Sequence, residues 1–141
     1  MPDKLPEQDA LASWARDSVA KRRAGQNAQC ECGETRIRAL NTKRKPIRCF
    51  RCIRKSKGQT TNDRHHIAGK SNSPVTAPVP VNDHRAELSP AQYDWPRRTL
   101  ENPDRSPLLA AAACIRGFRD YVVYLIDRVL LWIPDMLEKA E

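Results

Sequence analysis

The fold of this chain is most constrained by four cysteines that form two close pairs. Cys30 and Cys32 make the first pair, and Cys49 and Cys52 make the second. Zn²⁺ prefers four tetrahedral thiolate ligands, and two short pairs supply them from two turns. Because the segment has few large apolar side chains, it is not expected to fold without an ion. The pattern predicts a closed structural zinc site. Disulfides, or a redox pair at Cys49 and Cys52, are the alternatives.

The positive charge of the chain is concentrated around these cysteines. The sequence has a net charge of +8, and residues 16–57 hold 14 Lys and Arg against three acidic residues. Clustered Lys and Arg displace counterions from phosphates, so this segment indicates contact with a polyanion. A solvated basic surface is the alternative. The residues expected to contact nucleic acid are Lys43, Arg44, Lys45, Arg51, Arg54, Lys55, Arg64 and Arg85.

The N-terminal part of the chain predicts one helix and no signal peptide. Residues 1–11 are acidic, contain proline and lack an apolar region, so we expect a cytoplasmic protein that uses thiolates rather than disulfides. Residues 9–24 predict a helix in which Leu11, Trp14 and Val19 share an apolar stripe. Packing on the core is the expected role of Trp14. Presentation of the basic end of the helix to DNA is the alternative for this segment.

Three histidines lie in the middle of the chain, in a region rich in turn-forming residues. His65 and His66 are adjacent, and His84 follows a stretch in which alternating valines and prolines predict short extended pieces. Asn82 or Asp83 is a good N-cap for a helix that begins near His84. A neutral imidazole accepts a proton near pH 7, and two imidazoles hold a divalent ion with positions open for phosphate oxygens. Taken singly, each histidine is equally compatible with an ordinary surface position.

The stretch from about residue 49 to residue 90 resembles the HNH endonucleases, also called ββα-metal or His-Me finger nucleases. The resemblance lies in the His65-His66 pair, a loop with Asn72, and the Asn-x-His-Arg sequence that contains His84. In that family a strand carries the pair, a loop with a central Asn follows, and a helix supplies a metal ligand in its first turn. The resemblance therefore implies the fold and the activity of that family for this chain.

The resemblance implies a role for each residue of the motif. His66 matches the general base, and His65 and His84 match the ligands of one divalent ion, commonly Mg²⁺, with Mn²⁺ or Ni²⁺ as options. Asn72 matches the central Asn that holds the base in orientation, and Asn82 competes for that role. The implied chemistry is single-metal hydrolysis of DNA phosphodiester bonds.

One feature of the sequence departs from the family pattern. Many members share a zinc ion between an upstream Cys-x-x-Cys and a second one on the helix. Here Cys49 and Cys52 supply the upstream pair, whereas Pro80 and Asp83 stand at the helix-side positions. We therefore expect the pair at residues 30 and 32 to complete the zinc site.

The C-terminal part of the chain gives the longest helix signal. It opens at Ser106 and Pro107, runs to about Trp132, and is expected to kink or end at Pro134. Apolar and charged residues recur at helical period on different faces, which indicates an amphipathic helix rather than a membrane span. We expect its apolar face to pack on the core or on a partner chain, with a homodimer as one option. Cys114 is expected to be a small buried residue.

Together these patterns predict an α+β protein: a small ββα-metal core with a preceding four-cysteine zinc element, an N-terminal helix and a long C-terminal amphipathic helix. The expected function is that of a metal-dependent endonuclease acting on DNA, with no membrane partner. A non-catalytic zinc-dependent nucleic-acid-binding protein is the first rival, and an assembly protein working through its C-terminal helix is the second. The expected segments are the N-terminal helix (1–29), the zinc element (30–62), the HNH-like core (63–90), an irregular linker (91–106) and the C-terminal helix (107–141).

Overall fold

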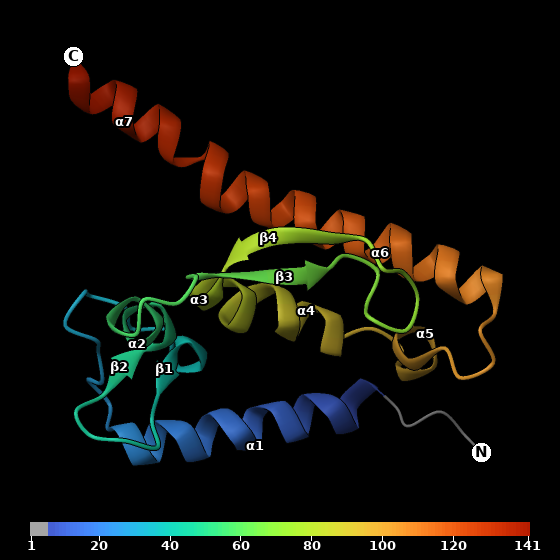
Figure 1. Ribbon diagram of the computed structural model, residues 1–141, viewed down its shortest axis with the longest axis horizontal. Coiled ribbons are helices and arrows are strands. Elements are labelled where there is room, and N and C mark those ends of the chain that lie inside the picture. The colour runs from blue at the N-terminus through green and yellow to red at the C-terminus, as the bar shows by residue number, and fades with distance from the viewer. Residues whose placement is uncertain (1–5) are drawn as a thin grey trace.

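The computed structural model describes residues 6–141 as a small α+β fold with two separate two-stranded sheets. Figure 1 shows α1 along one side, the β3–β4 hairpin in the middle, and α6 and α7 crossing the other side. Within residues 6–141, none of the helices combines the length and the apolar run that a membrane crossing requires. The elements are α1 (Pro6–Ala24), η1 (Ile37–Ala39), β1 (Leu40–Asn41), β2 (Arg48–Cys49), α2 (Phe50–Ser56), β3 (Asn62–His66), β4 (Thr76–Pro80), α3 (Val81–Asp83), η2 (His84–Leu88), α4 (Ser89–Tyr93), α5 (Arg97–Glu101), α6 (Pro107–Leu125), η3 (Ile126–Leu130) and α7 (Trp132–Ala140).

The β3–β4 hairpin presents the histidine pair. Its strands are antiparallel, and His65 lies opposite Ala77. Side chains alternate between the two faces of a strand, so Asp63 and His65 share one face while Arg64 and His66 share the other. Burial follows this alternation, because His65 is buried and Arg64 is exposed. The prediction of extended pieces around the prolines is confirmed by β4.

A helical segment leaves β4 without a loop and runs through α3, η2 and α4 to Tyr93. The backbone amide of Val81 bonds Thr61 O at 2.8 Å, so the hairpin register fixes the helix start at Val81. The predicted start near His84 is therefore three residues too late. The prediction of Asn82 or Asp83 as N-cap is also wrong, since Pro80 takes that position and both residues lie inside α3.

The segment 91–106, expected to be an irregular linker, contains the short helix α5. Asn102 closes α5 with a left-handed φ of 39°, a conformation that Asn tolerates better than most residues. Ser106 then caps α6 by accepting a hydrogen bond from Leu109 N at 3.4 Å. The predicted helix start at Ser106 and Pro107 is thereby confirmed.

α6 packs against the backbone of the loop that follows β3. A Cβ atom on Gly117 would lie only 1.7 Å from Ile67 O, so no larger residue fits at this crossing. Cys114 points to solvent, and the prediction that it is buried is wrong. The contacts of α6 with the body instead use Ala113, Gly117 and Tyr124.

The helical geometry of the C-terminal segment changes before Pro134, not at it. The π-helical turn η3 and Leu131 separate α6 from α7, and Pro134 is the third residue of α7. A proline ring displaces the carbonyl four residues earlier, here that of Leu130, so the disturbance falls N-terminal to the proline. The change in helical geometry therefore lies about one turn before Pro134, where the kink was expected.

The N-terminal helix α1 ends at Ala24 as predicted and is followed by Gly25 with a φ of +90°. It is held to the body by Arg38, whose guanidinium bonds Asp17 at 2.9 Å and also contacts Ser13. The side chain of Trp14 is 70% exposed, so the expected packing of Trp14 on the core is wrong. Helix α1 is therefore attached to the body through polar contacts with η1 and not through an apolar stripe.

The buried apolar residues of the described chain fall into three small clusters instead of one continuous core. The first surrounds the cysteine pairs, the second lies under the loop after β3, and the third joins the hairpin to α6. Small separate clusters contribute little hydrophobic stabilisation each. The first cluster, which consists of Cys30, Leu40 and Cys49, has the most to gain from a bound ion.

Candidate functional site

The two cysteine pairs come together as one four-sulfur cluster. All four Sγ atoms lie within 4.8 Å of one another, and the Sγ atoms of Cys32 and Cys49 are 3.6 Å apart. Tetrahedral Zn–S bonds of about 2.3 Å require sulfur–sulfur distances of about 3.8 Å, so the cluster has the right size for zinc. Gly33, with a φ of +90°, lets the chain turn back after the first pair. The predicted gathering of the four cysteines is confirmed.

The thiols of this cluster are chemically unequal without an ion. The backbone amide of Glu34 and hydrogen bonds from the other thiols lower the pKa of Cys32 to about 6, against the effect of burial. Burial and hydrogen bonds to the neighbouring cysteines raise the pKa of Cys52 to about 12. Four thiolates therefore require a cation among them, as a structural Zn²⁺ provides. The donor set and its size fit that ion.

Asn82 and Arg36 connect the cysteine cluster to the histidine-bearing helix. Asn82 accepts a hydrogen bond from Arg51 N at 3.0 Å and donates to Glu34 at 3.1 Å. The guanidinium of Arg36 forms ion pairs with three carboxylates: Glu34 at 2.8 Å, Asp83 at 2.8 Å and Glu87 at 2.6 Å. The zinc element and the helix from Val81 are thus one unit, held by partly buried charges.

Replacing Arg36 with methionine is expected to destabilise the protein by about 2 kcal/mol. The substitution keeps the aliphatic stem but leaves the carboxylates of Glu34, Asp83 and Glu87 close together without their shared cation. Urea unfolding of the zinc-loaded protein measures the change. Arg36→Lys keeps the positive charge but not the forked guanidinium group, so this variant should lose less stability than Arg36→Met. A midpoint unchanged by Arg36→Met would show that this network does not hold the two elements together.

The histidine site lies between β3 and η2. The rings of His65 and His84 are 5.2 Å apart between centroids and meet edge to face. Burial, followed by the charges of His84 and His66, lowers the pKa of His65 to about 4, so this imidazole is neutral near pH 7. Its Nδ1 is buried and has no hydrogen-bond partner among the described residues, which is a common sign of a missing ion or water. This atom is therefore open to an ion or to a water.

Asp63 is an additional member of this site. A carboxylate only accepts, so the Nδ1–H of His84 donates to Asp63 Oδ2 at 2.8 Å, and the neutral ring has its lone pair on Nε2. Burial opposes ionisation of Asp63, but the hydrogen bond to His84 and the ion pair with Arg54 outweigh it and lower the pKa of Asp63. Carboxylates commonly orient metal-binding histidines in this way. The signal in the sequence was the two-residue spacing of Asp63 and His65, which places both on one strand face.

His66 has a different environment on the other face of β3. It is half-buried, and its Nδ1 lies 3.3 Å from the backbone oxygen of Ser73. A carbonyl oxygen only accepts, so Nδ1 carries the proton and Nε2 keeps a lone pair. Gln92 donates to His66 O at 2.6 Å and lies 3.4 Å from His65 Nε2, thereby holding the strand end against α4. No pattern in the sequence marked Gln92.

Asn72 organises the loop that follows the histidine pair. Its amide donates to Ala68 O at 3.0 Å and Thr99 O at 2.9 Å, and its oxygen accepts from Asn102 at 2.9 Å. These bonds tie the loop to the end of α5. The ring of His66 bonds Ser73, the residue after Asn72, so any effect of Asn72 on His66 passes through the loop backbone.

Three of the predicted phosphate contacts have partners within the protein. Arg54 forms an ion pair with Asp63 at 2.7 Å, and a hydrogen bond to the thiol of Cys32 raises the pKa of Arg51. The guanidinium of Arg85 lies 3.9 Å above the Phe50 ring. The other five are exposed to solvent: Lys43, Arg44, Lys45, Lys55 and Arg64.

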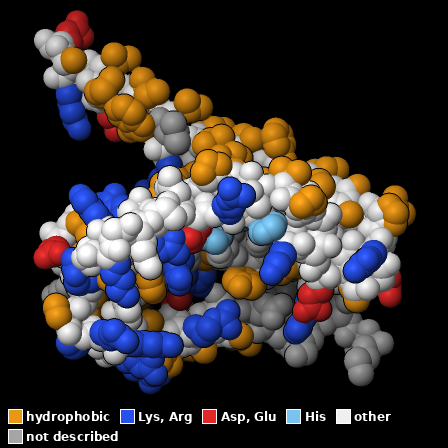
Figure 2. Space-filling model, in the orientation of Figure 1, with side chains coloured by type: hydrophobic (Ala, Val, Ile, Leu, Met, Phe, Trp, Pro, Cys, Tyr) orange, Lys and Arg blue, Asp and Glu red, His pale blue; other side chains and the backbone are white. Residues whose placement is uncertain are grey.

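Two hollows border these basic residues. Arg44, Lys45, Arg48 and Lys57 line a groove of about 450 Å³ between the β1–β2 turn and α2. Figure 2 shows a second hollow between α1 and the hairpin, with histidine side chains on one rim and Lys and Arg on the others. The second hollow places Lys and Arg side chains on the face that carries the histidines.

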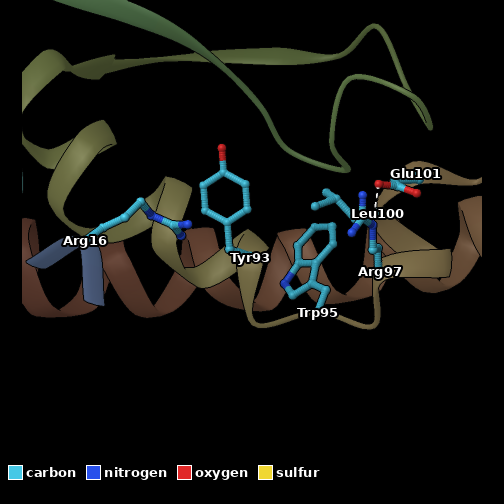
Figure 3. Close-up of a pocket in the computed structure, with 6 residues that line it drawn as sticks. All are labelled: Arg16, Tyr93, Trp95, Arg97, Leu100 and Glu101. Atoms are coloured by element: carbon cyan, nitrogen blue, oxygen red, sulfur yellow. Dashed lines mark hydrogen bonds and ion pairs between the residues drawn. The ribbon is translucent and has the colours of Figure 1, made fainter. Parts of the chain in front are cut away.

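A pocket of about 430 Å³ separates α1 from α4 and α5. Figure 3 shows Arg16 of α1 extending toward the ring of Tyr93, with Trp95 and Leu100 beyond it. Tyr93 directly follows Gln92, which donates to the backbone oxygen of His66 at the end of β3.

Among the described residues, the cysteines are the one group of three or more ligands whose donor atoms lie within 4.8 Å of one another. The histidine site offers two nitrogens, so an ion held there would keep open positions. No family model, curated protein or solved structure matches the chain.

Proposed function

We propose that this chain is a metal-dependent endonuclease with an HNH-like ββα core made by β3, β4 and the helix that begins at Val81. The observation that carries the proposal is the pairing of His65 with His84 across strand and helix, at 5.2 Å between ring centroids. The Asp63–His84 hydrogen bond and the orphaned Nδ1 of His65 give further support. Two imidazoles suit Mn²⁺ and Ni²⁺ at least as well as Mg²⁺.

His66 acts as the general base in this proposal. Its Nδ1–H is engaged by Ser73 O, so Nε2 accepts the proton of a water that attacks phosphorus. The bond from phosphorus to the 3′ oxygen breaks, and the leaving oxygen takes a proton from solvent. A divalent ion held by His65 and His84 would supply stabilisation of the charge on the phosphate and leaving oxygen. Asp63 fixes the tautomer of His84.

The substrate lies in the hollow between α1 and the hairpin. Arg64 shares the strand face of His66 and contacts a phosphate near the scissile bond. Arg44 and Lys45 hold the backbone further along, where contacts position the substrate without reading its sequence. A base next to the scissile phosphate can stack on Tyr93, which is exposed beside the site. The expected activity therefore has low sequence specificity.

Nicking of supercoiled plasmid by zinc-loaded protein tests the proposal. Nicked circles are expected when Mg²⁺, Mn²⁺ or Ni²⁺ is added and not when these ions are omitted. DNA binding is measured separately over a series of salt concentrations, because phosphate contacts weaken steeply with salt. Salt-sensitive binding without nicking in any of the three ions would replace the proposal with a non-catalytic zinc-dependent nucleic-acid-binding protein.

The exchange Asp63→Asn is expected to lower the affinity for the catalytic ion by roughly ten- to a hundredfold. The amide no longer holds His84 in the tautomer that presents Nε2. The Mn²⁺ concentration that gives half-maximal nicking measures this shift. Arg54→Met is the matched control, because it removes the other partner of Asp63 and keeps the bond to His84. Equal shifts in both variants would contradict the orienting role of Asp63.

A further inference from the structure

The pocket between α1 and the α4–α5 segment has a lining suited to a flat aromatic ring. Tyr93, which ends α4, is 57% exposed, and its hydroxyl bonds no described residue. Trp95 and Leu100 add an indole ring and an aliphatic side chain to the lining (Figure 3). The indole N–H of Trp95 donates at 2.8 Å to Asp120, which does not line the pocket, so this polar group is already satisfied. The pocket therefore offers ring stacking and apolar contact.

Arg16 gives this pocket an available positive charge. Its side chain extends from α1 toward the ring of Tyr93 (Figure 3), and its guanidinium forms no hydrogen bond or ion pair with any described residue. Among the described lining residues, Glu101 is the acidic one, and it is paired with Arg97 at 2.6 Å. An anion that enters the pocket therefore meets Arg16 without facing an unpaired carboxylate.

Basic residues lead away from the pocket along α1. Arg16 also lines a second hollow of about 430 Å³, together with Arg23 and Lys43. Arg44, the residue after Lys43, lines the groove beside α2. A series of cations of this length attracts a chain of phosphates more strongly than a single small molecule. The occupant that combines a flat ring with a chain of negative charges is a nucleobase on its phosphate backbone.

Only an unpaired base can use the ring of Tyr93. Inside a duplex, both faces of each base pair are covered by its neighbours, so stacking on a side chain requires a base outside the stack. The pocket volume, about 430 Å³, is that of a site for one small ligand and not for a double helix. Gln92, the residue before Tyr93, donates to the backbone oxygen of His66 at 2.6 Å, so the wall of the pocket is tied to the strand end that carries the proposed general base.

We propose that this pocket binds one unpaired base of the DNA substrate, with Tyr93 stacked on the base and Arg16 in contact with a phosphate beside it. The preferred substrate is then single-stranded DNA, or duplex that contains unpaired bases, rather than fully paired duplex. Negative supercoiling favours local unpairing, so this preference agrees with the nicking of supercoiled plasmid expected above. The preference in cleavage rests on the proposed nuclease function, whereas binding of the base does not require cleavage.

Fluorescence anisotropy with labelled oligonucleotides, measured without Mg²⁺, Mn²⁺ or Ni²⁺, tests the pocket apart from catalysis. The probes are a short DNA strand, the same strand with abasic sites, and its paired duplex. Zinc-loaded protein is expected to bind the natural strand more tightly than the other two probes. Tyr93→Ala should weaken binding of the natural strand by roughly five- to a hundredfold and leave the abasic strand unchanged, whereas Tyr93→Phe keeps the ring and should bind as wild type. Arg16→Gln should weaken binding of both strands, because both have the same phosphates.

Two control variants lie away from the pocket. Phe118→Ala removes an exposed ring from α6, and Lys139→Gln removes an exposed charge from α7, so both should bind as wild type. Circular dichroism and zinc content confirm that each variant is folded, and the comparison of natural and abasic strands on the wild-type chain needs no variant. Tighter binding of the duplex, or an equal loss on natural and abasic strands in Tyr93→Ala, overturns the pocket assignment. Binding that depends on Tyr93 for an RNA strand but not for DNA overturns the assignment to DNA.

Cleavage with Mn²⁺ separates the pocket from the proposed nuclease function. A duplex that contains an unpaired bubble is expected to be cut roughly tenfold faster than paired duplex, and Tyr93→Ala should lose this preference. Strand binding that depends on Tyr93, without cleavage of any probe, would remove the nuclease function and leave the pocket. Equal cleavage of paired and unpaired DNA, unaffected by Tyr93→Ala, would leave the nuclease function and remove the pocket.

Discussion

His66→Ala is expected to slow plasmid nicking by about 10²- to 10⁴-fold while leaving DNA affinity and zinc content unchanged. The substitution removes the Nε2 lone pair that takes the proton from the attacking water. It leaves the proposed ion ligands, which lie on the other face of β3, in place. His66 is half-buried at the strand end, so its loss opens space at the surface without emptying the core. Single-turnover nicking at saturating Mn²⁺ measures the chemical step.

Two controls separate loss of a base from loss of structure. Arg64→Ala changes a residue on the same strand face and should alter DNA affinity but not the maximal rate. Imidazole added to His66→Ala should restore part of the rate, because the space left by the ring can admit a free base. Unchanged nicking by His66→Ala would contradict its assignment as base, whereas lost DNA binding would indicate a folding defect.

The parts of the fold that follow from short-range patterns were predictable. The spacing of the cysteines predicted their cluster, and the alternation of valine and proline predicted β4. Ser106 followed by Pro107 marked the start of α6, because a hydroxyl cap and a proline at the first turn favour that position. Each of these signals is complete within a few residues of sequence.

The parts that depend on long-range contacts were not predictable. The helix starts at Val81 because the hairpin register bonds its amide to Thr61 O, and Asn82 then serves the start of α2 instead of its own helix. The exposure of Trp14 and Cys114 reflects which faces the neighbouring elements cover. Apolar residues at helical spacing predict an apolar face on the helix. They do not predict which element covers that face, because that element is distant in sequence.

The roles of polar residues were likewise predictable only where the signal lies within a few residues of sequence. Asp63 could have been placed beside His65 from strand alternation, since the two residues are two apart. Gln92, Asn102 and Arg36 had no such signal, because each acts on a segment distant in sequence. The candidate ligands and base are therefore readable from sequence, whereas the groups that hold them in place require the fold.

Cys49→Ser is expected to abolish zinc binding and to unfold the zinc element, with an apparent loss of stability of about 5 kcal/mol or more. Cys49 belongs to the four-sulfur cluster and to the first apolar cluster, and its Sγ accepts from Cys52 N at the start of α2. A hydroxyl is a poor zinc ligand, so one substitution removes the metal and the capping sulfur together. Metal analysis and thermal unfolding measure both effects.

Cys114→Ser makes the same chemical change at an exposed position outside the cluster, so zinc content and unfolding temperature should not change. Thiol titration in denaturant with chelator should find all five cysteines reduced, and fewer thiols would indicate a disulfide in place of zinc. Cys49→Ser should also destabilise the histidine site, because Arg36 and Asn82 join the zinc element to the helix from Val81. Hydrogen exchange in the helix from Val81 should accelerate, and unchanged protection there would show that the histidine core folds independently of the zinc element.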